Sequence, residues 1–271
     1  MNSIKELFND IHNHARHHGD RVIIDVIFQN GKPIVEQRPC TCILLLQALK
    51  ENNMLFGEFN LPTLSLVFEE LAAVPSGVVK TITNTTFAAI TDRGKVVTWG
   101  NEYYGGDSSA VAGELASGVV EVVATDFAFA ALKVGGSVVT WGSAGYGGDS
   151  RAVAGDLVSG VVKVVATWYS FAALTEDGKV VSWGEAEYGG DSSRVARELA
   201  SGVVKVVATQ GAFAALKEGG RVVSWGDTEY GGDSSAVVDE LASGVIEVVA
   251  MSRNSFSARK GNGWVTRWGG V

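Results

Sequence analysis

Apolar and polar positions follow two different patterns along this chain of 271 residues. Near the N-terminus, Ile4, Leu7, Phe8 and Ile11 keep the spacing of one helix face. From residue 76 onward, short valine-rich runs are separated by glycine turns instead. There the runs 119–125, 129–133 and 137–142 predict three strands, the last two joined by a Gly-Gly hairpin turn. The second part of the chain therefore consists of three-stranded units.

This three-stranded pattern returns at a constant interval of about 42 residues, so the chain is a repeat protein. A Trp-Gly pair closes each unit, at Trp99, Trp141, Trp183, Trp225 and, after one extra residue, Trp268. The first four pairs lead into a Tyr-Gly-Gly-Asp-Ser connector, which predicts a short helical turn capped by its Asp or Ser. Such periods are typical of propellers and solenoids. We predict five units and four connectors over residues 76–271.

Residues 1–75 contain no copy of the repeat. After the first helix, Asn30-Gly31 between two β-branched runs predicts a hairpin over about residues 21–36. The runs 42–50 and 64–71 predict two further helices. The chain is therefore expected to hold a small α+β domain (1–75) followed by a mainly β repeat domain (76–271).

Composition narrows the classes of function. The net charge of −8 and the pI near 5.1 argue against nucleic-acid binding and against attraction to anionic membranes. No apolar run is long enough to span a bilayer, and the N-terminal residues lack a signal peptide. Cys40 and Cys42 are too close in sequence for a disulfide framework. We expect a cytoplasmic protein, with export by a signal-independent route left open.

The runs 201–209 and 212–226 resemble repeats of the regulator of chromosome condensation superfamily. They carry Ser-Gly-Val before the first strand, Ala-Leu-Lys before a glycine turn, and Val-Val-x-Trp-Gly at the end. The resemblance is greatest to the short-repeat branch typified by β-lactamase inhibitor protein II. It implies a β-propeller that binds other macromolecules. This chain has five units where the family usually has seven, and Gly-Gly-Asp-Ser where the family has Gly-Gln.

The unit count leaves several arrangements open. The five units could form a five-bladed ring, an open arc, or a ring completed by a second copy in a homo-oligomer. A β-solenoid with one repeat per coil is the structural alternative. In each arrangement the chain is a rigid frame that presents loops.

The loop between the first and second strands varies from unit to unit, whereas most other positions barely change. Variable, partly aromatic loops on a fixed frame predict a binding face for a protein partner. The candidate binding residues are Asp126, Phe127, Trp168, Tyr169, Gln210, Arg253 and Asn254. A second variable strip, at residues 101–103, 143–145, 185–187 and 227–229, is either another face or solvated surface.

Other kinds of chemistry are weaker in this sequence. The repeat units hold no histidine, so their serines have no general base, and we predict no enzyme and no cofactor. His14 and His18 have a zinc-like spacing without a third ligand, and each unit offers one connector aspartate where calcium needs six to eight oxygens. We predict no metal.

The repeated tryptophans are interpreted as packing between blades. The uniform tyrosines 104, 146, 188 and 230 favour one other reading, a carbohydrate-binding propeller lectin with one sugar between each pair of blades. Loop diversity favours the first hypothesis, a non-enzymatic protein-interaction module acting as scaffold or inhibitor.

Overall fold

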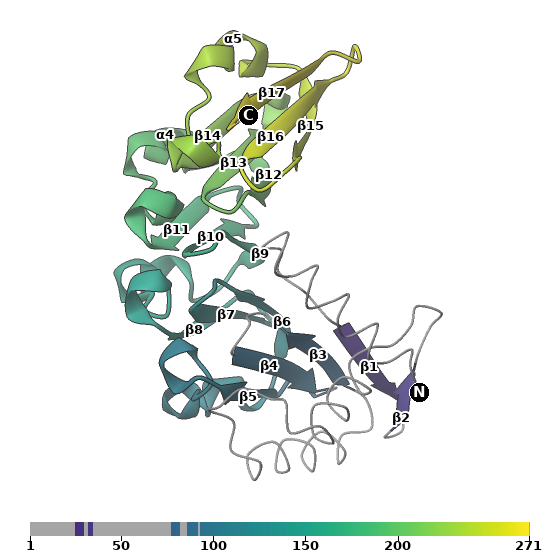
Figure 1. The fold of residues 1–271 in the computed structure, drawn as a ribbon, viewed down its shortest axis with the longest axis vertical. Helices are drawn as coiled ribbons and strands as arrows, with labels where there is room; N and C mark the ends of the chain where they lie inside the picture. The colour runs from purple at the N-terminus through teal and green to yellow at the C-terminus, as the bar shows by residue number, and fades with distance from the viewer. Residues whose placement is uncertain (1–24, 30–31, 35–76, 82–85, 92, 271) are drawn as a thin grey trace, which may run out of the picture. The chain divides into compact units, whose positions relative to one another are not determined.

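The computed structural model describes residues 25–29, 32–34, 77–81, 86–91 and 93–270 (Figure 1). The chain divides into two compact units, Met1–Val119 and Val120–Val271. The predicted helices at 4–11, 42–50 and 64–71, the histidine cluster and the cysteine pair lie outside the described residues. Among the helices that are described, none is long and apolar enough to cross a membrane.

The first unit holds a five-stranded sheet of order β2-β1-β3-β4-β5. Its strands are β1 (Asp25–Gln29), β2 (Lys32–Ile34), β3 (Gly77–Thr81), β4 (Thr86–Thr91) and β5 (Val96–Gly100). The antiparallel β1–β2 pair confirms the predicted hairpin. β1 also pairs with β3, Ile27 opposite Val78, so the hairpin extends the sheet of the first repeat. The boundary at residue 75 stays a prediction, because strands on both sides of it share a sheet.

The second unit holds four three-stranded sheets, one for each remaining repeat. They are β6 (Val119–Ala124), β7 (Ala128–Lys133) and β8 (Val138–Gly142); β9 (Val161–Ala166), β10 (Ser170–Thr175) and β11 (Val180–Gly184); β12 (Val203–Ala208), β13 (Ala212–Lys217) and β14 (Val222–Gly226); and β15 (Val245–Ala250), β16 (Ser255–Lys260) and β17 (Val265–Gly269). Each sheet is an antiparallel meander. This confirms the mainly β, three-stranded units of a propeller; the coils of a β-helix would pair in parallel instead.

The connectors are short helical segments, as predicted. They are η1 (Glu102–Tyr104), η2 (Ser109–Val111) and η3 (Glu114–Ala116); η4 (Ala144–Tyr146) and η5 (Arg151–Asp156); η6 (Ala186–Gly190), η7 (Ser193–Val195) and α4 (Ala196–Leu199); and η9 (Thr228–Tyr230), η10 (Ser235–Val237) and α5 (Val238–Leu241). A further short helix, η8 (Glu218–Gly220), forms the β13–β14 hairpin turn.

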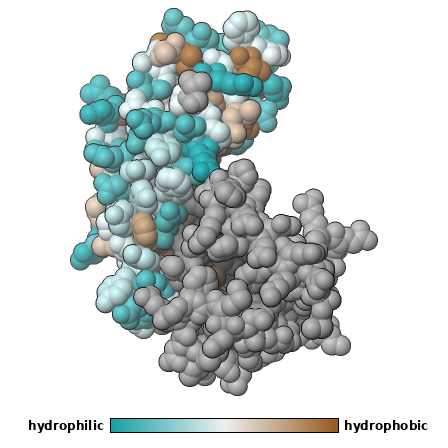
Figure 2. All heavy atoms as spheres, in the orientation of Figure 1, coloured by the Kyte–Doolittle hydropathy of each residue, from teal (hydrophilic) through white to brown (hydrophobic). Residues whose placement is uncertain are grey.

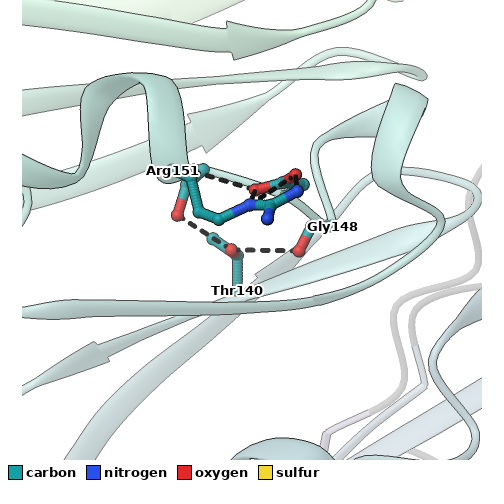
Figure 3. Close-up of polar contacts among 5 residues, drawn as sticks. Thr140, Gly148 and Arg151 are labelled. Carbon is teal, nitrogen blue, oxygen red and sulfur yellow. Dashed lines mark hydrogen bonds and ion pairs between the residues drawn. The ribbon is translucent and has the colours of Figure 1, made fainter.

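Each connector is fastened to the third strand of its own sheet. In the second repeat the Thr140 hydroxyl donates to the Gly148 carbonyl at 3.2 Å and lies 2.9 Å from the Ser150 hydroxyl (Figure 3). Asp149 accepts the Arg151 backbone N–H and forms an ion pair with its guanidinium, which together lower the pKa of Asp149 to about 2. The connector aspartates therefore cap turns, as the sequence indicated.

The core lies between successive sheets rather than within any one of them. Ala212, Ala214 and Leu216 on one face of β13 pack against the next sheet, where Phe256 and Trp268 are buried. The same arrangement recurs at the two preceding interfaces of the second unit. Both sides of each interface come from the same repeat positions. The same set of residues therefore packs between every pair of sheets in this unit.

A ring pair explains the fixed Trp-Gly and Tyr-Gly-Gly motifs. Phe213 stacks on Trp225 at a centroid distance of 5.2 Å, and the Trp225 indole N–H donates to the Gly189 carbonyl at 3.0 Å. A Cβ on Gly189, whose φ is +92°, would lie 2.7 Å from the Phe213 ring. Only glycine lets the connector approach the stacked pair this closely. The repeated tryptophans are therefore packing residues, as interpreted from the sequence.

The last sheet departs from the repeat on its outward face. Strand pairing places Ser255, Ser257 and Arg259 at the positions that carry Ala212, Ala214 and Leu216 one unit earlier. Arg259 is exposed and forms an ion pair with Glu247 at 2.9 Å. Figure 2 shows a largely hydrophilic surface over the repeats, with hydrophobic residues among those near the last sheet. This face of the last sheet is therefore more polar than the equivalent face of the sheet before it.

Candidate functional site

The variable loops of the second unit are joined to one another through their backbones. The N–H of Asp126 donates to the Trp168 carbonyl, that of Trp168 to the Gln210 carbonyl, and that of Gln210 to the Arg253 carbonyl, each at 2.8 Å. The first two of these bonds link equivalent positions of successive repeats. This loop ladder fixes the spacing of the side chains that the loops present.

A buried threonine at the start of the loop in the second, third and fourth repeats ties that loop to its own connector. The Thr167 hydroxyl lies 3.2 Å from the Tyr188 carbonyl and accepts the Tyr169 N–H at 3.3 Å. Thr125 repeats these contacts with Tyr146 and Phe127. Threonine therefore brings a loop aromatic and a connector tyrosine together, although they are about twenty residues apart in sequence.

These constraints assemble six rings into one cluster, which we call the aromatic row: Phe127, Tyr146, Trp168, Tyr169, Tyr188 and Tyr230. Tyr169 is at its centre, stacked on Phe127 at 5.7 Å and edge-on to Tyr188 at 4.5 Å. Trp168 extends the row to Tyr230 at 6.0 Å. These centroid distances are those of favourable aromatic pairs.

The aromatic row is half-buried, with every one of its rings at intermediate exposure. Burial and the negative charge of Asp126 raise the pKa of Tyr169. Burial, the neighbouring Tyr230 and the carboxylate of Asp227 raise the pKa of Tyr188. The phenols of Tyr169 and Tyr188 are therefore neutral at physiological pH and lie near carboxylates, a combination that offers aromatic faces and phenol hydroxyls to a ligand.

The structure separates the candidate residues into two groups. Phe127, Trp168 and Tyr169 meet in the aromatic row, with Asp126 beside them. Gln210 and Arg253 belong to the loop ladder through their backbones, and the Asn254 carbonyl accepts the Gly270 N–H at 2.9 Å. Their roles in binding stay predictions.

Sequence reasoning missed that Tyr146, Tyr188 and Tyr230 belong to the same surface as the loops. Their uniform recurrence one position before the Gly-Gly pair was a signal, but it was assigned to a separate sugar-binding hypothesis. Trp264, outside the row, is 60% exposed in the turn between β16 and β17.

Residues 161–189 match the family model of the regulator of chromosome condensation (RCC1) repeat. These residues form an RCC1 repeat. The matched segment runs from β9 to the Tyr188-Gly189 pair, and the same motif recurs at the equivalent positions of the neighbouring units. The finer resemblance to β-lactamase inhibitor protein II stays a prediction. No curated protein sequence matches the chain.

Several solved structures are similar to the fold of this chain. Human WBSCR16 is 22% identical with a TM-score of 0.41, covering 68% of this chain and 59% of that one. Prp20p from Saccharomyces cerevisiae is 13% identical with a TM-score of 0.46, covering 91% and 66%. The computationally designed Ika8 protein is 10% identical with a TM-score of 0.35, covering 69% and 56%. The chain therefore matches less than two thirds of the length of each of these proteins.

Proposed function

We propose that this protein is a non-enzymatic interaction module that binds a protein partner through the aromatic row, as a scaffold or an inhibitor. The observation that carries the proposal is the convergence of Phe127, Trp168 and Tyr169 with the connector tyrosines on one held surface. Large aromatic side chains dominate the energetics of protein interfaces. The RCC1 repeats support the same class of function, and a cytoplasmic location is part of the proposal.

The loops that carry the aromatic row are preorganised, which favours tight binding. The loop ladder and the Thr167 contacts hold the loops before any partner arrives, so little conformational entropy is lost on association. The frame can keep this geometry while the loop residues change, which accounts for constant sheets beside variable loops.

The alternative is the lectin hypothesis. The connector tyrosines on which it rests have different neighbours in different repeats. Tyr146 contacts Phe127 and Tyr169, whereas Tyr230 contacts Trp168 and Tyr188. One sugar pocket per blade would need the same surroundings for each tyrosine. Binding of a glycan from an array, lost on replacing these tyrosines, would favour the lectin.

The test is a quantitative pull-down from the source lysate with wild type and a Phe127→Ala, Trp168→Ala, Tyr169→Ala variant. A matched control, Tyr103→Ala with Trp264→Ala, removes exposed aromatics outside the row. The proposal expects a protein that wild type and control retain and the triple variant loses. A partner retained equally by all three proteins would exclude the aromatic row as the binding surface, and circular dichroism checks that each is folded.

A further inference from the structure

Carboxylates border the aromatic row along the connectors of the third and fourth repeats. Glu185 and Glu187 precede Tyr188, and Asp227 and Glu229 stand at the same places before Tyr230. Asp126 lies in the variable loop, and its negative charge contributes to the raised pKa of Tyr169. The segments 185–192 and 227–234 contain no lysine or arginine. We call these five carboxylates, Asp126, Glu185, Glu187, Asp227 and Glu229, the acidic rim.

A groove opens between the same two connectors, and no ring of the aromatic row lines it. It has a volume of about 760 Å³, and its charged lining consists of Glu187, Asp191, Asp227, Asp233 and Arg194. It shares Glu187 and Asp227 with the acidic rim. Four carboxylates against one guanidinium leave the groove negative. Its size admits a long side chain of a partner that also contacts Glu187 and Asp227.

The fold does not require a negative charge at the positions of Glu187 and Asp227, because in the first repeat the uncharged Asn101 makes the same cap as Asp227. The Asp227 carboxylate caps η9 by accepting the Glu229 N–H at 2.8 Å, and the equivalent place in the second repeat is Ser143. Glu187 is exposed, and its equivalents in the neighbouring repeats are Gly145 and Glu229. The fold therefore accepts uncharged residues at these places, and the charges are free to serve binding.

We propose that the aromatic row and its acidic rim bind a cationic, extended segment of a protein partner, with arginine or lysine side chains over the rings. This inference rests on the proposed function and specifies the partner's chemistry. A guanidinium is attracted to the face of tyrosine or tryptophan and simultaneously to carboxylates at the ring edge. The net charge of −8 would also steer a cationic partner toward the protein. An acidic or wholly apolar partner would leave the rim unpaired.

The experiment measures binding of three fluorescein-labelled peptides to the full chain by fluorescence polarisation. One peptide alternates arginine with serine over about twelve residues; the second has citrulline in place of arginine, and the third has glutamate. Citrulline keeps the planar side chain without its charge. We expect the arginine peptide to bind about tenfold or more tightly than the citrulline peptide, and the advantage to shrink as salt rises from about 0.05 M to 0.3 M.

Two pairs of substitutions separate the rim from general attraction to an acidic protein. Glu187→Gln with Asp227→Asn removes two rim charges, and Glu176→Gln with Glu218→Gln removes two exposed charges from hairpin turns. We expect the first pair to weaken arginine-peptide binding about threefold to tenfold and the second pair to change it less than twofold.

Three results would overturn the inference. They are equal binding of arginine and citrulline peptides, equal effects of the two charge pairs, and no binding of the arginine peptide at millimolar concentration. If the peptides bind equally but Trp168→Ala with Tyr169→Ala abolishes binding, the row remains the docking surface and only its preference for cations is wrong. If that ring variant binds the arginine peptide as wild type does, the proposed function fails as well.

Discussion

The backbone N–H of Trp168 donates to the carbonyl of Gln210 at 2.8 Å and so joins the same loop position of two successive repeats. Equivalent bonds on either side make the variable loops part of a continuous ladder. Loops held in this way behave more like strands than like surface connections. The positions whose side chains vary most between repeats therefore share one backbone conformation, because the ladder bonds involve only backbone groups.

The ladder predicts slow hydrogen exchange in these loops. We expect the amides of Asp126, Trp168 and Gln210 to be protected to a degree similar to strand amides, because each donates to a neighbouring unit. Val134, exposed at a hairpin turn, is the internal comparison and should exchange fast. Exchange followed by mass spectrometry or NMR measures both, and equal rates at Trp168 and Val134 would contradict the ladder.

The close approach of Gly189 to Phe213 predicts a large effect of one methyl group. Gly189→Ala combines a left-handed backbone with a Cβ 2.7 Å from the ring, so we expect a loss of about 2–4 kcal/mol in the free energy of unfolding. Gly113→Ala is the matched control, because Gly113 is helical (φ −63°, ψ −40°) with no atom near the added methyl. Its expected effect is a gain of about 0.4–1 kcal/mol. Urea titration of both variants decides; an unaffected Gly189→Ala protein refutes the packing argument.

Thr167→Val tests the link between loop and connector. Valine keeps the shape of threonine but leaves the N–H groups of Tyr169 and Ser170 without their hydroxyl acceptor, and should cost about 1–3 kcal/mol; the Tyr188 carbonyl keeps the Ser170 hydroxyl as a donor. Because the Thr167 hydroxyl holds the backbone of Tyr169, the near-ultraviolet circular dichroism of the aromatic row should change as well. Thr140→Val, at a half-buried connector contact, is expected to cost less. An unchanged aromatic signal in folded Thr167→Val protein would show that the row is positioned by other contacts.

The raised pKa values of Tyr169 and Tyr188 predict a loss of stability at alkaline pH. In the unfolded chain these phenols ionise near pH 10, whereas in the folded chain they ionise later. Their contribution to stability is therefore complete below about pH 10 and is lost as pH rises through the folded pKa. Tyr169→Phe should make unfolding between about pH 9 and 11 less dependent on pH. A slope identical to that of wild type would contradict the shift assigned to Tyr169.

The polar face of the last sheet predicts how the array could be made to associate. We consider a variant that gives β16 the apolar residues with which β13 packs against the following sheet. Its substitutions are Ser255→Ala, Ser257→Ala and Arg259→Leu. We expect this variant to self-associate in a concentration-dependent way, because Arg259→Leu places an exposed apolar side chain next to the exposed Val265. Arg151→Leu, which adds one exposed leucine on a connector, should not associate. Sedimentation velocity distinguishes the two variants. A monomeric triple variant would show that Arg259 is not what prevents this face from associating with a second copy.

The repeat units were predictable because each of their signals recurs several times. Gly135-Gly136, the Val-Val runs and Trp-Gly specify a turn, two strands and a strand end from local sequence, and the structure has them there. Within the described part of the chain, the pairing of β1 with β3 could not be predicted, because it joins segments about fifty residues apart with no shared motif.

The candidate site was predictable only in part, for a similar reason. Phe127, Trp168 and Tyr169 were visible as excess aromatics in variable loops. Their contact with Tyr146 and Tyr188 depends on a buried hydroxyl that reaches a carbonyl 21 residues further along, and nothing in the local pattern specifies that bond. Tertiary hydrogen bonding, rather than periodicity, makes one surface from two motifs.

Near-identical interfaces have a genetic consequence. A recombination event that adds or deletes the codons of one whole repeat in register places a Phe-Trp pair against the same glycine that it met before, so the new neighbours fit without further mutation. Each event would add or remove one connector tyrosine, whereas the loop aromatics would depend on which repeat was copied. Selection could thus change the length of the array in whole repeats.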